Sequence, residues 1–134
     1  AAGTVIAQTG DNQLGHTNSA NIPNMVINGG IFTASSPFGG GMWFEGITMT
    51  GGTVNGTTGL NPQNAANSFL TTLAAATTAT VSTSIANAKT NFVITVADGA
   101  AASDLTISNV ISGGGGVQKE GPGTLSLTTF NTYT

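Results

Sequence analysis

Short stretches in which every second residue is apolar recur along this chain, and glycine-rich corners separate them. Residues 92–96 place Phe92, Ile94 and Val96 on one face, and residues 124–128 alternate Leu125 and Leu127 with hydroxyl side chains. A period of two is the pattern of a half-buried strand. Glycine and asparagine tolerate the left-handed backbone that tight corners require. The sequence therefore predicts an all-β fold built from many short strands.

A sandwich, a barrel and a solenoid all use such strands. We favour a β-solenoid because the predicted inward positions mix Ile, Val, Leu and Ala with Thr, which suits stacks of like residues in successive turns. The spacing of the segments indicates repeats of about twenty residues, at the short end for stacked architectures. The chain is expected to form a single domain over residues 1–134, with an irregular, Gly- and Asn-rich part at 1–61 and repeat-like rungs at 62–134.

Residues 63–76 fit two structures. Their apolar residues fall at helical spacing, but the threonine pairs at 71–72 and 77–78 are β-branched and residues 80–85 continue with period two. We predict strand, with a short helix near 63–76 as the alternative. Two glycines at 29–30 predict a tight corner or a hairpin turn, and Asn61-Pro62 predicts a boundary.

Charged side chains make up only 5% of the chain, against about 25% in an ordinary soluble domain. There is no Arg, the only Lys residues are Lys89 and Lys119, and the formal charge is −3. This composition offers no basic surface for nucleic acid or for an anionic membrane, and no apolar run reaches the length of a membrane span. A surface so poor in charge gives weak protection against association. We therefore expect either that the chain is flanked by more of itself, or that its ends and faces are covered by a partner.

The chain contains no cysteine and begins with small residues rather than Met. A small-residue start is typical of a chain from which a signal peptide has been removed, or of a segment excised from a larger protein. We expect an exported protein with a cleaved signal peptide, located outside the cell or on its surface.

Residues 91–134 resemble the autotransporter-associated β-strand repeat of long bacterial surface proteins. The resemblance is carried by FVITVADG at 92–99, LTISNVISG at 105–113, and the pattern K-x-G-x-G-T-L-x-L at 119–127 followed by N-T-Y-T at 131–134. It covers about a third of the chain. It implies a right-handed parallel β-helix that is exported and has no enzymatic role of its own.

In that family the N-T-Y-T element continues into a Gly- and Thr-rich segment, whereas this sequence stops at Thr134. Residues 1–5, AAGTV, look like a piece of that continuation, as do residues 50–56. We therefore expect one copy to meet the next head to tail. The candidate subunit contacts are Ala1, Thr4, Val5, Phe130, Tyr133 and Thr134.

Few residues could support chemistry. Asp98 and Asp104 are spaced for neighbouring turns and could form a carboxylate pair, or could bind Ca²⁺ together with Asn91, but both aspartates stand at turn positions where Asp bonds the backbone. His16 has no second ligand near it in sequence, and Lys119 with Glu120 suggests a solvated corner or a local ion pair. We predict no catalytic residue, no cofactor and no metal site.

The only dense aromatic cluster comprises Phe38, Trp43 and Phe44. It fits a core end or a subunit contact better than a sugar-stacking platform, although surface glycans remain a candidate partner.

The expected function is that of a self-assembling extracellular subunit of a bacterial surface fibre or biofilm matrix filament. The alternative is a stalk or adhesin module of a long passenger protein. A carbohydrate-active β-helix enzyme is less favoured, because two lysines and no arginine give a poor site for an acidic sugar.

Overall fold

The computed structural model describes residues 5–8, 24–35, 41–62, 69–87 and 91–134. These residues form strands, bends and irregular connections, with no helix among them. Their sixteen strands are β1 (Val5–Gln8), β2 (Asn24–Asn28), β3 (Ile31–Ala34), β4 (Met42–Phe44), β5 (Gly46–Thr50), β6 (Thr53–Gly56), β7 (Leu60–Pro62), β8 (Leu70–Thr72), β9 (Ala79–Val81), β10 (Ile85–Asn87), β11 (Asn91–Val96), β12 (Leu105–Ile107), β13 (Ile111–Gly113), β14 (Gly116–Glu120), β15 (Leu125–Leu127) and β16 (Thr132–Tyr133).

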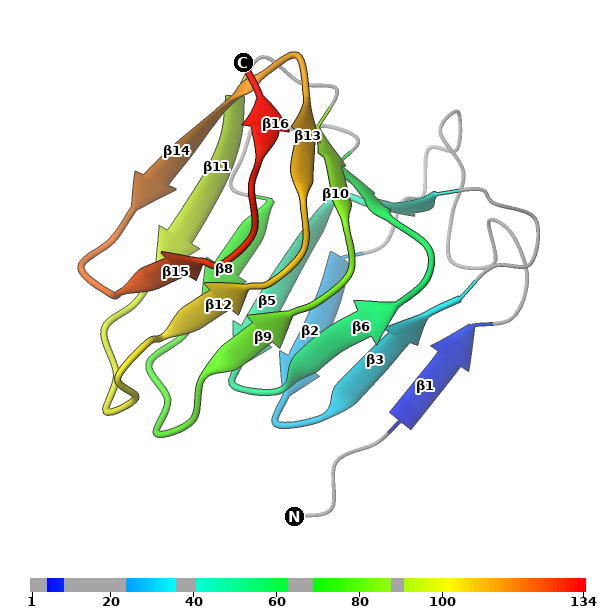
Figure 1. Cartoon of the computed structure of the whole chain (residues 1–134). Coiled ribbons are helices and arrows are strands. Elements are labelled where there is room, and N and C mark those ends of the chain that lie inside the picture. Colours follow the sequence, from blue (N-terminus) through cyan, green and yellow to red (C-terminus); the bar gives the residue numbers. More distant parts are fainter. Residues whose placement is uncertain (1–4, 9–23, 36–40, 63–68, 88–90) are drawn as a thin grey trace.

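The strands lie in three sheets, and neighbouring strands in each sheet run parallel (Figure 1). Sheet A has the order β1-β3-β6-β9-β12-β15, sheet B the order β14-β11-β8-β5-β2, and sheet C the order β16-β13-β10-β7-β4. From β2 onward the chain visits sheet B, then sheet A, then sheet C, and moves on by one strand with each round. The molecule is therefore a parallel β-solenoid, as the alternating segments predicted.

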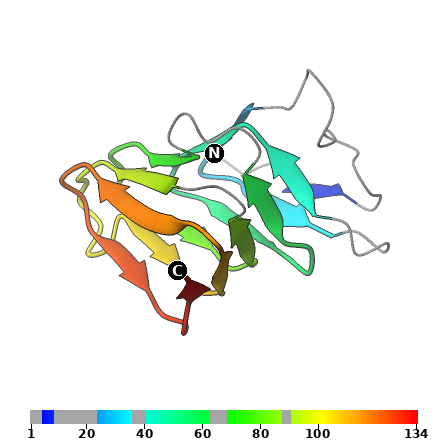
Figure 2. The ribbon, with the colours of Figure 1, turned by 90° about the horizontal axis from the view of Figure 1, so that it is seen from above.

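Figures 1 and 2 together show the coil winding in a right-handed sense from the N-terminal to the C-terminal end. Parallel strands joined by a crossover take this hand in nearly all proteins, because the twist of each strand favours it. Strands β2 to β16 make five successive rungs of three strands, and β1 adds one more strand to sheet A alone.

The rungs differ in length. Paired residues in neighbouring strands are 18 residues apart between Met42 and Leu60, and 27 apart between Thr53 and Thr80. The corners absorb this variation, so the columns of side chains stay aligned although the repeat has no fixed period.

The core consists of apolar columns that run along the axis inside the three sheets. In sheet A, the buried residues Phe32, Val54, Val81 and Ile107 are successive partners. In sheet B the corresponding run is Met25, Ile47, Leu70 and Ile94, and in sheet C it is Met42, Leu60, Ile85 and Ile111. Phe69 and Phe92 pack with ring centroids 5.2 Å apart, which adds aromatic contact to the core.

The corners of the solenoid differ in part from the local predictions. Gly29-Gly30 forms a corner between two sheets, not a hairpin, and Gly29 has a left-handed φ of 69°. Residues 80–85 do not form one strand, because the chain turns between β9 and β10 at the buried Thr83, whose hydroxyl donates to the Thr58 carbonyl at 2.6 Å. Pro62 is the last residue of β7, so this strand ends at the predicted boundary.

The helical alternative for residues 63–76 is wrong for its described part. Residues 69–76 contain the short strand β8 and a turn, while residues 63–68 lie outside the described residues. A membrane-spanning helix is also absent from the described part of the chain.

Candidate functional site at the ends of the solenoid

The last rung leaves the core columns of the solenoid uncovered. Leu127 follows Ile107 in the interior column of sheet A, and 36% of its surface is exposed, whereas Ile107 is 1% exposed. Leu125 follows the buried Leu105 in the same sheet. Val117, Leu125 and Tyr133 are partly buried against the core. These four side chains, Val117, Leu125, Leu127 and Tyr133, form the C-terminal end surface.

One charged residue interrupts this surface. Lys119 is the partner of the buried Ile94 in sheet B, so by register it occupies the interior column, yet its side chain is exposed. Its Nζ donates a hydrogen bond to the Gly121 carbonyl at 2.7 Å. Glu120 accepts a hydrogen bond from Gln118 at 2.9 Å. A charged side chain on an edge strand is one of the features by which natural sheets limit unselective strand pairing.

The N-terminal end is stepped. β1 covers the edge of β3 in sheet A, while β2 in sheet B and β4 in sheet C are the outermost described strands of their sheets. Val26 on β2 is 75% exposed and Ile31 on β3 is 41% exposed. The edge of β1 in sheet A therefore lies one strand further out than the edges of β2 in sheet B and β4 in sheet C.

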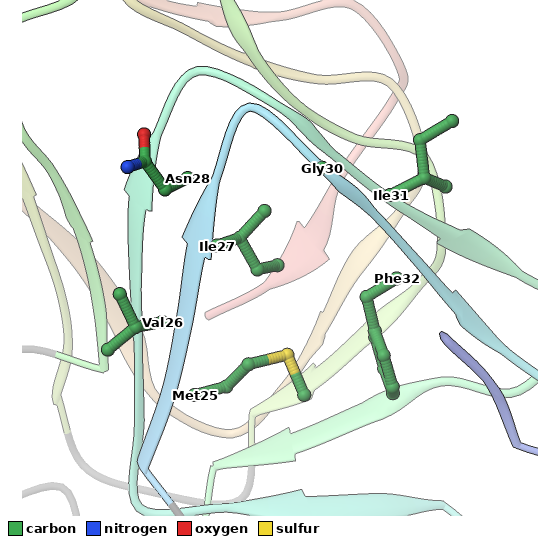
Figure 3. Close-up of a pocket in the computed structure, with 7 residues that line it drawn as sticks. All are labelled: Met25, Val26, Ile27, Asn28, Gly30, Ile31 and Phe32. Atoms are coloured by element: carbon green, nitrogen blue, oxygen red, sulfur yellow. The ribbon is translucent and has the colours of Figure 1, made fainter. Parts of the chain in front are cut away.

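A pocket of about 190 Å³ opens beside β2 (Figure 3). Met25, Ile27 and Phe32 lie on its inner side and belong to the core columns, while Val26 and Ile31 point away from them. The remaining lining residues are Asn28 and Gly30. Among the described residues that line the pocket, none is an acid, a base or a nucleophile.

The two carboxylates considered from the sequence, Asp98 and Asp104, lie in different surroundings. Asp104 is buried, and its two oxygens accept hydrogen bonds from the Gly99 and Thr124 backbone amides, each at 2.8 Å. Asp98 is exposed, and Asn91 instead donates to the Gln118 side chain at 3.1 Å. In the described part of the chain no three His, Cys, Asp or Glu side chains gather as metal ligands would. Asp104 therefore links the corner at Gly99 to the corner at Thr124 through hydrogen bonds.

The aromatic cluster predicted from the sequence is divided between the two faces of β4. Phe44 is fully buried and packs edge-on against Phe32, with ring centroids 5.9 Å apart. Trp43 is half-buried on the opposite face, because successive residues of a strand point to opposite sides. Phe38 and His16 lie outside the described residues. The order Met42, Trp43, Phe44 was enough to predict this division, because neighbouring residues in a strand point to opposite faces.

The candidate subunit contacts fall at opposite ends of the stack where the structure describes them. Val5 begins β1 at the N-terminal end and is the partner of Ile31. Phe130, 86% exposed, lies between β15 and β16 at the other end, with Tyr133 partly buried and Thr134 exposed. Ala1 and Thr4 lie outside the described residues. Sequence reasoning missed Leu127 and the β2 pocket, because both depend on which strand ends a sheet.

The outer face of sheet A carries hydroxyl and amide side chains in columns. One column runs through Thr53, Thr80, Thr106 and Ser126. The Ser103 hydroxyl bridges two of its members, at 3.0 Å from Ser126 and 3.4 Å from Thr106. No charged side chain lies on the described strands of this sheet.

No protein-family model matches this chain, and neither a curated protein nor a solved structure does.

Proposed function

We propose that this protein is a structural subunit that assembles head to tail into an extracellular fibre, as part of a bacterial surface or biofilm matrix. The observation that carries the proposal is the uncovered end of the core: Leu127 follows four buried residues of its column and is itself exposed. Every earlier member of that column is covered by the next rung of the same chain. A rung from a second copy would cover the last member in the same way.

The two ends differ from each other, so a contact between them is heterologous. A heterologous contact repeats from copy to copy and produces a filament unless the rotation closes a ring. Parallel strand pairing across the junction would provide backbone hydrogen bonds for the edges of both copies. The charge content of 5% supports the proposal, because few like charges oppose such an approach.

Electron microscopy of negatively stained protein, together with size-exclusion chromatography, tests the proposal. We expect the purified protein to form filaments at micromolar concentration. The substitution Leu127→Asp places a charge in the contact, and we expect it to raise the concentration needed for assembly by at least about tenfold, because an unpaired buried charge costs several kcal/mol.

The matched control is Ser108→Asp, which adds the same charge to an exposed position one rung earlier in the chain. This variant should assemble as the parent protein does. A parent protein that stays monomeric over the whole concentration range contradicts the proposal.

A stalk or adhesin module of a long passenger protein is the alternative, because further rungs in the same polypeptide would cover the same ends. The covalent context separates the two functions. A much longer reading frame that ends in a translocator barrel would favour the module, and a reading frame of about this length would favour the subunit.

Our proposal includes no enzymatic activity. In agreement with this choice, the described residues that line the pocket beside β2 include no titratable side chain. Surface glycans are a candidate partner of the half-buried Trp43 on the outer face of sheet C. Binding to immobilised polysaccharides, compared between the parent protein and Trp43→Ala, tests this idea, and an intact protein that binds none of them contradicts it.

A further inference from the structure

We infer that sheet A alone carries the junction between copies, with β15 of one copy paired in parallel with β1 of the next. The pairs across the junction are Ser126 with Val5 and Leu127 with Ile6. This inference rests on the proposed head-to-tail assembly and specifies its partner, a second copy of this chain, and its register.

The register follows from columns that already run through sheet A. Val5 and Ile6 are partners of Ile31 and Phe32, and from there the columns continue without a break to Ser126 and Leu127. Ile6 thus belongs by register to the interior column that Leu127 ends. Placing the next copy's β1 on β15 continues both columns by register, and it gives the exposed Leu127 a partner strand.

The stepped N-terminal end excludes a closer approach in the other two sheets. Because β1 occupies the edge of β3, an incoming β15 can approach no nearer than β1. β14 of the incoming copy then lies two strand spacings from β2, or about 10 Å, since neighbouring strands are about 5 Å apart. Direct pairing of β14 with β2 would require β1 to leave sheet A.

The same step keeps the pocket beside β2 away from the contact. Met25, Ile27 and Val26 are on the strand that β14 does not reach, so the exposed face of Val26 remains open to solvent in the fibre. A junction that used all three sheets would instead bury this strand. The two arrangements therefore differ in which residues become neighbours.

The chain contains no cysteine, so pairs of introduced cysteines report on this difference directly. A disulfide needs Cα atoms about 4.4–6.8 Å apart, which fits partners in neighbouring strands but not partners two strands apart. We combine Val5→Cys with Ser126→Cys to test the sheet A junction. The pair Val26→Cys with Glu120→Cys tests the alternative, because these residues begin and end one outer column of sheet B.

Mild oxidation of assembled protein, followed by denaturing electrophoresis, should give a ladder of covalent oligomers for the first pair and none for the second. The single variants Val5→Cys and Ser126→Cys should give dimers at most. The pair Val5→Cys with Thr128→Cys is a control for register. Thr128 lies two residues after the expected partner of Val5, so the two Cα atoms would be about 8 Å apart.

The result separates the inference from the proposed function. Filaments that are cross-linked by the second pair, or by neither pair, overturn the sheet A junction while the assembly proposal stands. A protein that forms no filaments overturns both. In filaments of Val26→Cys alone, the thiol should react with a maleimide as fast as it does in the monomer, and protection of at least about tenfold would contradict the open pocket.

Discussion

Leu127 lies directly over Ile107 in sheet A, in the same interior column, but only Ile107 is covered on both sides. The two residues have the same size and the same orientation relative to the core. Their difference in exposure arises solely from their place in the stack. Core side chains are thus exposed at the end of the solenoid. In the proposed assembly, the next copy covers them and continues the core.

The first prediction compares these two residues in dilute monomeric protein. Ile107→Ala should lower the free energy of unfolding by about 2–5 kcal/mol, because it removes buried methyl groups and leaves a cavity. Leu127→Ala should lower it by about 1 kcal/mol or less, since the side chain is partly solvated already. Chemical denaturation with unchanged denaturant dependence measures both values. Equal losses would contradict the uncovered end.

The second prediction concerns Asp104. Replacement by Ala should destabilise the protein by about 2–4 kcal/mol, because two backbone amides lose a charged acceptor inside the structure. Asp104→Asn should recover only part of the loss, since its amide group can accept at one of the two positions only. Asp98→Ala is the matched control at an exposed position and should change the free energy of unfolding by about 0.5 kcal/mol at most.

A third prediction uses two glycines with left-handed backbone. Gly29 has a φ of 69°, and a Cβ added there would meet nothing within 4 Å. Gly29→Ala should therefore cost only the backbone strain, about 1–2 kcal/mol. Gly56 has a φ of 125°, and a Cβ there would overlap the backbone of Ala34 in the neighbouring strand.

Gly56→Ala must therefore displace β3 or β6 in addition to straining the backbone. We expect it to lower the melting temperature clearly more than Gly29→Ala does. Circular dichroism during heating of both variants makes the comparison. An identical melting temperature for the two would show that sheet A is not packed as described.

The alternation of side chains was enough to predict strands where one face is buried. Phe92, Ile94 and Val96 share the interior face of β11, and Leu125 is on the interior side of β15. The alternation of apolar and polar side chains shows only which face of each strand is buried. It failed at residues 80–85, because Thr83 is buried in a corner where its hydroxyl bonds the Thr58 carbonyl of the preceding rung.

The pairing of strands depends on information that no local pattern contains. Asp104 was recognised as a turn residue, but its second hydrogen bond comes from Thr124, twenty residues later in the chain. The rung lengths vary, so the residue that faces it could not be found by counting a fixed period. The pocket beside β2 was missed for the same reason, since it exists only because that strand has no described neighbour on one side.

The last prediction concerns the salt dependence of assembly. Strand pairing through sheet A brings together residues 126–127 and 5–6, none of which is charged. Salt screens charge interactions over about 10 Å at 0.1 M and about 3 Å at 1 M, so a junction without charges should respond little to this change. The critical concentration for filament formation, measured by sedimentation, should change less than about threefold between 0.05 and 0.5 M NaCl.

Glu120→Gln should not alter this result, because β14 lies outside the junction. A change of tenfold or more, abolished by Glu120→Gln or Lys119→Gln, would place β14 in the contact.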